Sequence, residues 1–198
     1  MKMIIRFSVE NYMSFKEQQI FSMAAGKGSR HASHIATANG NRLLKSSFIF
    51  GANAAGKSNF VHAIDFMRRT VISGSSKIGK SRDRFFRIDP ECSQKPGVFQ
   101  MELVADGNFY SYGFSINYQT REFQAEWLYD ITDEAEVCLF EPICAKRQAM
   151  LKSFRKKSLT IISFLILTRL LREQMDFVPQ ERDSWSSSAV ISANYFHF

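Results

Sequence analysis

The fold is decided by the stretch Ser47-Phe48-Ile49-Phe50-Gly51-Ala52-Asn53-Ala54-Ala55-Gly56-Lys57-Ser58. Its first four residues form a short apolar run that ends at a glycine, which is typical of a strand buried on both faces. After Ser58, apolar residues recur at helical spacing as far as Ile72, with polar residues between them. The sequence therefore predicts a strand, a glycine-containing loop and an amphipathic helix, in that order.

The loop of this stretch carries a motif with a known chemistry. Residues 51–58 match G-x-x-x-x-G-K-[ST], the phosphate-binding loop, in the strand-to-helix context that the motif requires. The glycines let the backbone turn tightly, so that N–H groups and the positive end of the helix face a phosphate. We expect Lys57 to contact the β- and γ-phosphates of ATP as the catalytic residue, and the Ser58 hydroxyl to ligate Mg²⁺. The predicted nucleotide-binding residues are Gly51, Ala52, Asn53, Ala54, Ala55, Gly56, Lys57, Ser58 and Asn59.

The residues around the motif resemble those of one group of ATPases. Gly-Ala-Asn-Ala-Ala-Gly-Lys-Ser-Asn at 51–59 resembles the Gly-x-Asn-x-x-Gly-Lys-Ser-Asn loop of SMC-like and ABC-type ATPases. Residues 4–15 resemble the strand followed by Asn-aromatic-x-Ser-Phe with which such proteins begin, and the strand at 110–114 is followed by Glu-Trp-Leu-Tyr at 126–129. Over residues 1–141 the chain therefore resembles the AAA-family ATP-binding proteins of the OLD-like and abortive-infection group.

This resemblance implies an ABC-type ATPase head with ATP and Mg²⁺ as cofactors. Two such heads sandwich ATP, which implies a homodimer, and heads of this kind are often coupled to DNA or to an effector protein in phage defence. The expected fold class is α/β, with a P-loop NTPase core like an ABC-ATPase head and an antiparallel β layer.

The rest of the first 141 residues reads mainly as β structure. Alternation over 3–9 and an apolar run at 19–23 predict an opening hairpin, and residues 24–41 are expected to form a loop that ends in a tight turn at Asn39-Gly40. Three further strands, at 98–104, 109–116 and 123–131, predict an antiparallel meander with Asp106-Gly107 at its first bend.

The elements needed for hydrolysis do not follow. A Walker B strand ends in Asp-Glu, but Asp133-Glu134 follows Tyr-Asp-Ile-Thr rather than four apolar residues, and no Leu-Ser-x-Gly-type signature is found. Hydrolysis is therefore expected only if the missing elements come from elsewhere. The pattern is lost after residue 141, so we expect an ATPase-head portion at 1–141 and an atypical basic tail at 142–198. Either the chain only binds nucleotide or, as we favour, a longer ATPase is truncated or frameshifted near Pro142.

Two other functions are compatible with parts of the sequence. The chain is alternatively a non-catalytic DNA-binding or regulatory module with a vestigial phosphate loop. A nucleotide kinase or small GTPase is disfavoured, because no guanine-reading Asn-Lys-x-Asp follows and the meander suits an ABC-type head better.

Several side chains outside the loop have both a functional and a structural interpretation. Gln100 is a candidate γ-phosphate sensor or a solvent-facing strand residue, and Tyr12 and Phe15 either pack near adenine or in the hairpin core. His31 and His34 lack the carboxylate or cysteine that would complete a metal site. The basic residues after the helix either contact DNA phosphates or lie on a solvated loop anchored by Phe85 and Phe86; they are Lys77, Lys80, Arg82, Arg84 and Arg87.

Composition sets limits on these interpretations. The 198 residues carry a net charge of +7 with 45% hydrophobic residues, which excludes a purely electrostatic, histone-like binder. Residues 142–198 hold 9 Lys+Arg and 4 Asp+Glu, so most of the excess charge lies in the tail and does not indicate nucleic acid. Three cysteines without a CxxC pair and the lack of a signal peptide predict a cytoplasmic protein. The apolar run 159–167 is too short to span a membrane.

Overall fold

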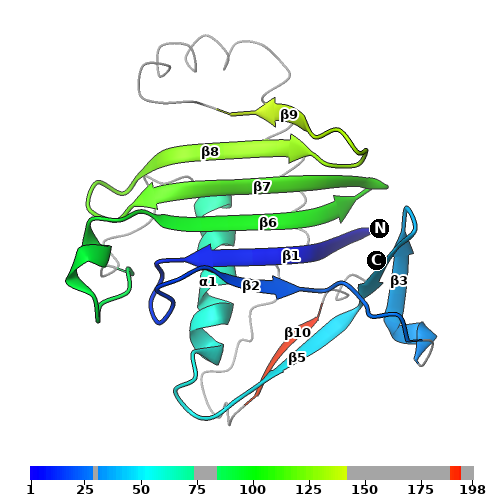
Figure 1. The fold of residues 1–198 in the computed structure, drawn as a ribbon, viewed down its shortest axis with the longest axis horizontal. Coiled ribbons are helices and arrows are strands. Elements are labelled where there is room, and N and C mark those ends of the chain that lie inside the picture. The colour runs from blue at the N-terminus through cyan, green and yellow to red at the C-terminus, as the bar shows by residue number, and fades with distance from the viewer. Residues whose placement is uncertain (29–30, 74–83, 142–187, 193–198) are drawn as a thin grey trace.

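The computed structural model describes residues 1–28, 31–73, 84–141 and 188–192 (Figure 1). In these residues, two short 3-10 helices, η1 (Ala32–His34) and η3 (Pro90–Ser93), accompany one α-helix, α1 (Lys57–Ser73). The strands are β1 (Lys2–Glu10), β2 (Gln19–Ser22), β3 (Ile35–Ala38), β4 (Asn41–Leu44), β5 (Ser46–Phe50), β6 (Gly97–Ala105), β7 (Asn108–Asn117), β8 (Glu122–Asp130), β9 (Val137–Phe140) and β10 (Ser188–Ser192).

A six-stranded antiparallel sheet forms the largest layer, in the order β2-β1-β6-β7-β8-β9. The predicted opening hairpin and the three-strand meander are both confirmed as parts of it. Two features were not predicted: β9 extends the meander, and β1 pairs with β6 from Lys2↔Ala105 to Glu10↔Val98. The antiparallel layer expected from the sequence is therefore present, and it includes the N-terminal hairpin.

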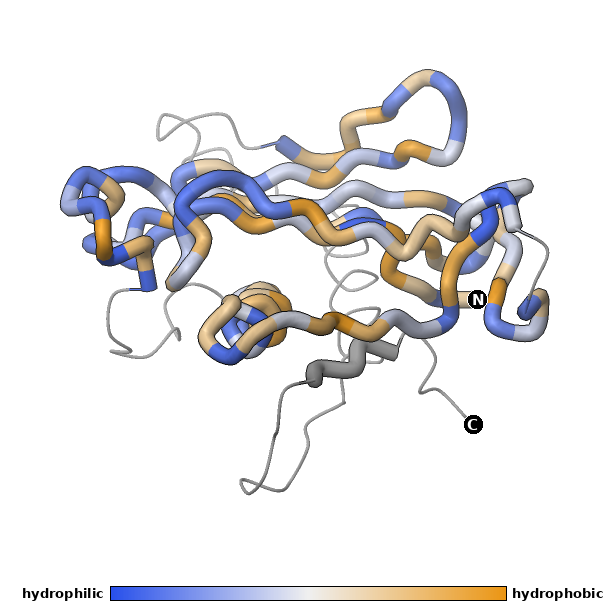
Figure 2. Tube along the Cα trace, turned by 60° about the horizontal axis from the view of Figure 1, so that its bottom comes forward, coloured by the Kyte–Doolittle hydropathy of each residue, from blue (hydrophilic) through white to orange (hydrophobic). Residues whose placement is uncertain are grey.

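The main core lies between this sheet and α1. Alternate residues of β1, β6 and β7 face the helix, and Phe7, Phe99 and Phe114 are completely buried there. The helix contributes every third or fourth residue, as expected for an amphipathic helix; these are Phe60, Ala63, Phe66, Met67 and Val71. Figure 2 shows the resulting two layers, with the sheet in one and α1 in the other. The predicted helix is thus confirmed, and burial of its apolar stripe holds it to the sheet.

We call the face of the sheet that points away from α1 the outer face. A smaller core covers part of it. There Met3, Val104 and Phe109 pack with Ala38 and Leu43 of the hairpin β3–β4. The prediction of a loop over 24–41 is wrong in part, because it missed η1 and β3. Its turn is confirmed, since Asn39 and Gly40 both have positive φ angles, 42° and 78°, as a two-residue hairpin turn requires.

The strand before the phosphate-loop motif departs from the prediction. β5 was expected to be buried on both faces, yet Phe48 and Phe50 are 58% and 73% exposed. Only Ile49 packs against the main core. Among the described residues, β5 is hydrogen-bonded to β10 alone and lies outside the six-stranded sheet. Within the part of the chain that the structure describes, no second layer covers the face that carries Phe48 and Phe50.

Two close approaches fix the meander and the segment before it. Trp127 lies against the backbone of Gly113 on the neighbouring strand, so that a side chain at that position would overlap the indole. Gly97 lies in the same way against the Tyr118 hydroxyl, which donates a hydrogen bond to the carbonyl of Asn11 at 2.7 Å. Burial raises the pKa of Tyr118, so the phenol remains a donor.

Some sequence predictions fall outside the described residues. They concern the helix break and basic residues within 74–83, Cys144, the apolar run 159–167 and most of the tail. Where the chain is described, no helix combines the length and the apolar character that crossing a membrane requires. Cys92 is buried and Cys138 is exposed, and both are free thiols.

Candidate functional site

The phosphate-loop motif connects the end of β5 to the first turn of α1. Residues 51–55 are exposed, and the chain takes left-handed conformations at Ala54 (φ 64°) and Gly56 (φ 91°). Among the first four helical residues, the N–H of Phe60 is bonded to the carbonyl of Gly56, at 3.0 Å. Within the described chain, the N–H groups of Lys57, Ser58 and Asn59 have no acceptor. The helix therefore presents a cluster of open donors, together with its positive dipole end, to the loop.

Lys57 closes the loop on itself. Its Nζ donates to the carbonyl oxygens of Gly51 and Ala52, both at 2.7 Å. The ammonium group thus joins the start of the loop to the start of the helix through two carbonyl oxygens. A third N–H donor of the same group remains for another acceptor. Ser58, the predicted Mg²⁺ ligand, is exposed at the same helix end.

A short turn of the N-terminal segment, residues 12–15, packs against the phosphate loop. Tyr12 and Phe15 bond to each other through both backbone N–H groups, at 2.9 and 2.8 Å. The Phe15 ring and the Ser14 hydroxyl lie against Gly56, where an added Cβ would be 3.3 and 3.0 Å from them. The Asn59 amide donates to Ser14 Oγ at 3.0 Å. Asn59, predicted to bind nucleotide, therefore has a protein partner in this turn.

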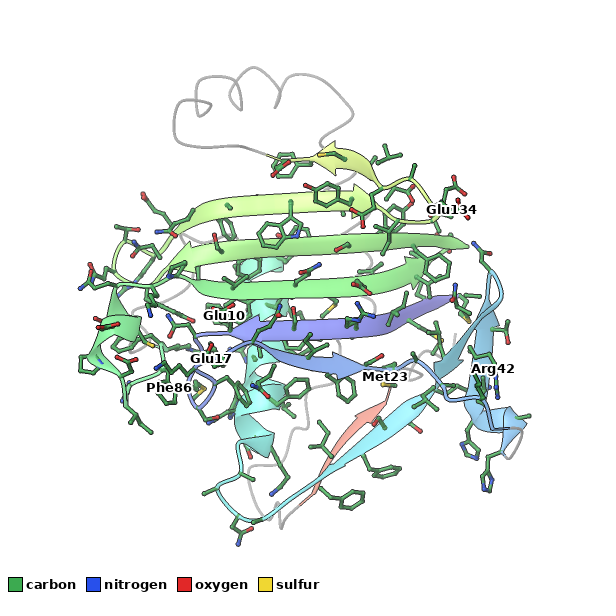
Figure 3. All side chains as sticks on the ribbon, in the orientation of Figure 1. Glu10, Glu17, Met23, Arg42, Phe86 and Glu134 are labelled. Atoms are coloured by element: carbon green, nitrogen blue, oxygen red, sulfur yellow. The ribbon has the colours of Figure 1, made fainter. Side chains whose placement is uncertain are left out.

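Asn11 and Tyr12 join that turn to the segment that precedes β6. The Asn11 amide donates to the carbonyls of Cys92 and Lys95, both at 2.9 Å, and its oxygen accepts from the N–H of Phe86 at 3.0 Å. Figure 3 shows Glu10, Glu17 and Phe86 at this end of the sheet. Asn11 takes a left-handed backbone conformation, φ 48°, which asparagine tolerates better than most residues. One buried side chain thus stabilises a long irregular segment.

Tyr12 is core, as one of the two interpretations of the sequence held. Its ring is fully buried between Phe66 and Phe99, and its hydroxyl donates to the carbonyl of His62 at 3.2 Å and accepts from Arg84 at 2.9 Å. Burial raises the pKa of Tyr12, and the Arg84 guanidinium partly offsets this rise.

Arg84 is half-buried and makes contacts within the fold, which agrees with the structural interpretation of this residue. Besides its bond to Tyr12, its guanidinium lies 5.2 Å from the centre of the Phe66 ring. Next to it, Phe85 packs against Tyr118, which agrees with the prediction of an anchoring phenylalanine. Arg87 is exposed, and Lys77, Lys80 and Arg82 lie outside the described residues.

The other candidates do not join the loop. Gln100 lies on the outer face, where its amide donates to Ser111 Oγ at 2.9 Å, so the proposal of a phosphate sensor is wrong and the solvent-facing interpretation holds. His31 and His34 have ring centres 6.1 Å apart. The described part of the chain contains no group of three or more metal-ligating side chains. Asp133-Glu134 lies in the connection between β8 and β9, away from any strand that pairs with β5.

Sequence reasoning missed the contact between the N-terminal turn and the loop. The signal was present, because the Asn-aromatic-x-Ser-Phe pattern at 11–15 was recognised, but only as a resemblance. The structure gives it a physical basis: Asn11 and Tyr12 anchor the turn, and Ser14 and Phe15 contact the loop.

Comparison with known families agrees with this geometry. Residues 46–176 match the family described as "AAA domain, putative AbiEii toxin, Type IV TA system". The match begins at β5, includes the whole phosphate-loop motif and α1, and continues past residue 141. Among curated proteins, none matches the sequence significantly. Because the matched range covers more than half of the chain, this protein belongs to that AAA family of P-loop, nucleotide-binding ATPase domains.

Proposed function

We propose that the chain binds Mg²⁺-ATP through residues 51–59. The observation that carries this proposal is the cluster of open N–H groups at Lys57, Ser58 and Asn59, with the Lys57 ammonium beside it. Backbone donors at a helix N-terminus and a lysine are the groups that recognise a polyphosphate. Gly51 and Gly56 allow the loop to wrap around it.

Lys57 and Ser58 have distinct roles in this proposal. Lys57 exchanges the two neutral carbonyls that it contacts now for the charged oxygens of the β- and γ-phosphates, which are stronger acceptors for an ammonium group. The exposed Ser58 hydroxyl supplies one oxygen ligand for Mg²⁺. Mg²⁺ in such sites takes its other ligands mainly from phosphates and water, so a single protein hydroxyl fits its chemistry. Bound Mg²⁺ would offset part of the negative charge of the triphosphate.

Binding without hydrolysis is the activity that these residues support. In-line attack on the γ-phosphate needs a residue that positions water beside the metal, such as a carboxylate or a glutamine. Asp133-Glu134 lies elsewhere, and Gln100 is committed to Ser111. We propose that an ABC-type head is completed by residues from another source, such as a second copy that sandwiches the nucleotide. A role in phage defence with a DNA or protein effector remains part of this proposal, by family resemblance.

The test is nucleotide-dependent thermal stabilisation of the full chain. Millimolar ATP with Mg²⁺ should raise the melting temperature, because a ligand at about 100 times its Kd stabilises the native state by about 2.7 kcal/mol. Lys57→Ala should abolish most of this rise. Lys95→Ala, which removes an equally charged but exposed side chain far along the sequence, should retain it.

The same experiment decides between this proposal and a DNA-binding or regulatory module with a vestigial loop. No stabilisation of the wild-type chain, or equal stabilisation of Lys57→Ala, would contradict ATP binding at the loop. DNA binding by the wild-type chain that is indifferent to ATP would instead support the alternative.

A further inference from the structure

The turn formed by residues 12–15 lies directly against the loop to which the proposed function assigns the nucleotide. Two contacts join them. Ser14 Oγ accepts a hydrogen bond from the Asn59 amide at 3.0 Å, and Ser14 and Phe15 occupy the side of Gly56 on which a Cβ would lie. Both contacts fall within three residues of Lys57.

The turn is itself held rigidly, so it is a fixed point for the loop. The Tyr12 ring is completely buried, and its hydroxyl is bonded to the carbonyl of His62 in the second turn of α1. On the other side, the N–H of Met13 donates to the carbonyl of Arg84 at 2.6 Å. The turn is therefore fastened both to the helix and to the segment that leads into β6.

Gly56 is a constrained position of the phosphate loop. Its φ of 91° is accessible mainly to glycine, and it precedes the first open N–H of the helix. Movement of the Ser14 side of the contact would change the direction in which the N–H groups of Lys57 and Ser58 point. The hydrogen bond that the Asn59 side chain donates to Ser14 Oγ fixes the same helical turn.

We infer that Ser14 is a positioning residue for phosphate binding, acting through Asn59 and Gly56. It holds the first turn of α1 so that its open N–H groups converge on one point, where the proposed function places the phosphates. The Asn59 side chain is then the partner of Ser14 and not a nucleotide contact, while its backbone N–H stays among the open donors. This inference rests on the proposed function.

The inference is tested by measuring Mg²⁺-ATP affinity of the full chain by calorimetric titration, together with its melting temperature without ligand. Loss of one hydrogen bond that orients the donors should weaken ATP binding about 3- to 10-fold in Ser14→Ala. Asn59→Ala should show a similar loss, and the double variant should lose no more than either single variant, because both remove the same interaction. Ser14→Thr keeps the hydroxyl and should restore most of the affinity.

Ser93→Ala is the matched control, because that half-buried serine also makes a hydrogen bond, to the carbonyl of Pro90, but does not contact the loop. It should bind ATP like the wild type. Wild-type affinity in Ser14→Ala, strict additivity with Asn59→Ala, or a fall in ligand-free melting temperature that accounts for the loss would overturn the positioning role. If Lys57→Ala binds ATP normally, or the wild type does not bind, the proposed function fails and this inference fails with it.

Discussion

Phenylalanines are buried in one region of the molecule and exposed in another. In the six-stranded sheet, Phe7, Phe99 and Phe114 are fully buried against α1, whereas Phe48 and Phe50 of β5 are 58% and 73% exposed. The β5 pair stacks on itself, with ring centres 6.1 Å apart. The residue type is the same, so the difference comes from whether a second layer covers the strand.

The comparison separates the part that stabilises the fold from the part that carries the chemistry. The sheet and helix bury a continuous aromatic core, while the phosphate loop extends from β5, in which Phe48 and Phe50 are exposed. The loop depends on α1 and on the turn at 12–15 for its shape, and only weakly on burial of β5. Stability and nucleotide binding should therefore respond to different substitutions.

The largest expected effect on the free energy of unfolding comes from replacing a phenylalanine by alanine in the sheet, compared with the same replacement in β5. Phe99→Ala removes a fully buried ring that contacts Tyr12, Phe66 and Phe114, and should lower the free energy of unfolding by about 3–5 kcal/mol. Phe50→Ala should change it by less than about 0.5 kcal/mol. Denaturant unfolding of both variants checks the contrast, and equal losses would show that β5 is covered in solution.

A smaller loss is expected where Gly97 meets Tyr118. In Gly97→Ala the new methyl group would displace the Tyr118 hydroxyl and leave the buried Asn11 carbonyl without its donor. Such losses cost about 1–3 kcal/mol. Gly26→Ala is the control, because a Cβ there meets nothing within 4 Å. Thermal unfolding compares the two variants. A melting temperature of Gly97→Ala equal to that of the wild type would contradict the close approach of Tyr118 to Gly97.

The next effect depends on pH. Burial raises the pKa of Glu126, whose carboxylate accepts a 2.7 Å hydrogen bond from Tyr112. Its stabilising contribution is therefore complete below the ordinary glutamate pKa and is lost as the pH rises through the raised native value. Glu126→Gln should be more stable than the wild type at neutral pH and lose that advantage in acid. Glu122→Gln, on the same strand but exposed, should show no such pH trend in unfolding measured from pH 4 to 8.

The smallest effect should come from the surface pair Arg6–Glu102 on the outer face. The two groups are 3.2 Å apart, and the Arg6 side chain is 51% exposed. Exposed pairs of this kind contribute about 0.2–1 kcal/mol. Glu102→Gln should lower stability within that range, and the loss should shrink at high salt. A loss above 2 kcal/mol would mean that the outer face is more enclosed than the structure shows.

Local patterns predicted local structure well. The hairpin of residues 3–23, the meander and the helix after Ser58 each follow from a period of two or of 3.6 residues, and all are confirmed. The pairing of β1 with β6 was not predictable, because it joins residues from Glu10↔Val98 to Lys2↔Ala105, far apart in the sequence, and no periodicity marks which strands become neighbours. The exposure of Phe48 and Phe50 was missed for the same reason, since burial depends on layers contributed by distant residues.

In the candidate site, too, local features were predicted and contacts between distant residues were not. The phosphate loop was found from its motif, because eight consecutive residues define its chemistry. The contact between Ser14 and Asn59 was not found, although both residues were quoted, because it spans 45 positions. The roles assigned to Lys57 and Ser58 remain predictions until nucleotide binding is measured.

The close approach of Trp127 to Gly113 gives the molecule an optical label for one of its two regions. The indole lies against the backbone between β7 and β8, so its emission should change when those strands separate. The protein has one other tryptophan, and replacing Trp185 with phenylalanine leaves Trp127 as the single emitter. Because the phosphate loop adjoins β1 and α1 rather than β8, this fluorescence should follow sheet unfolding and stay silent when ATP binds.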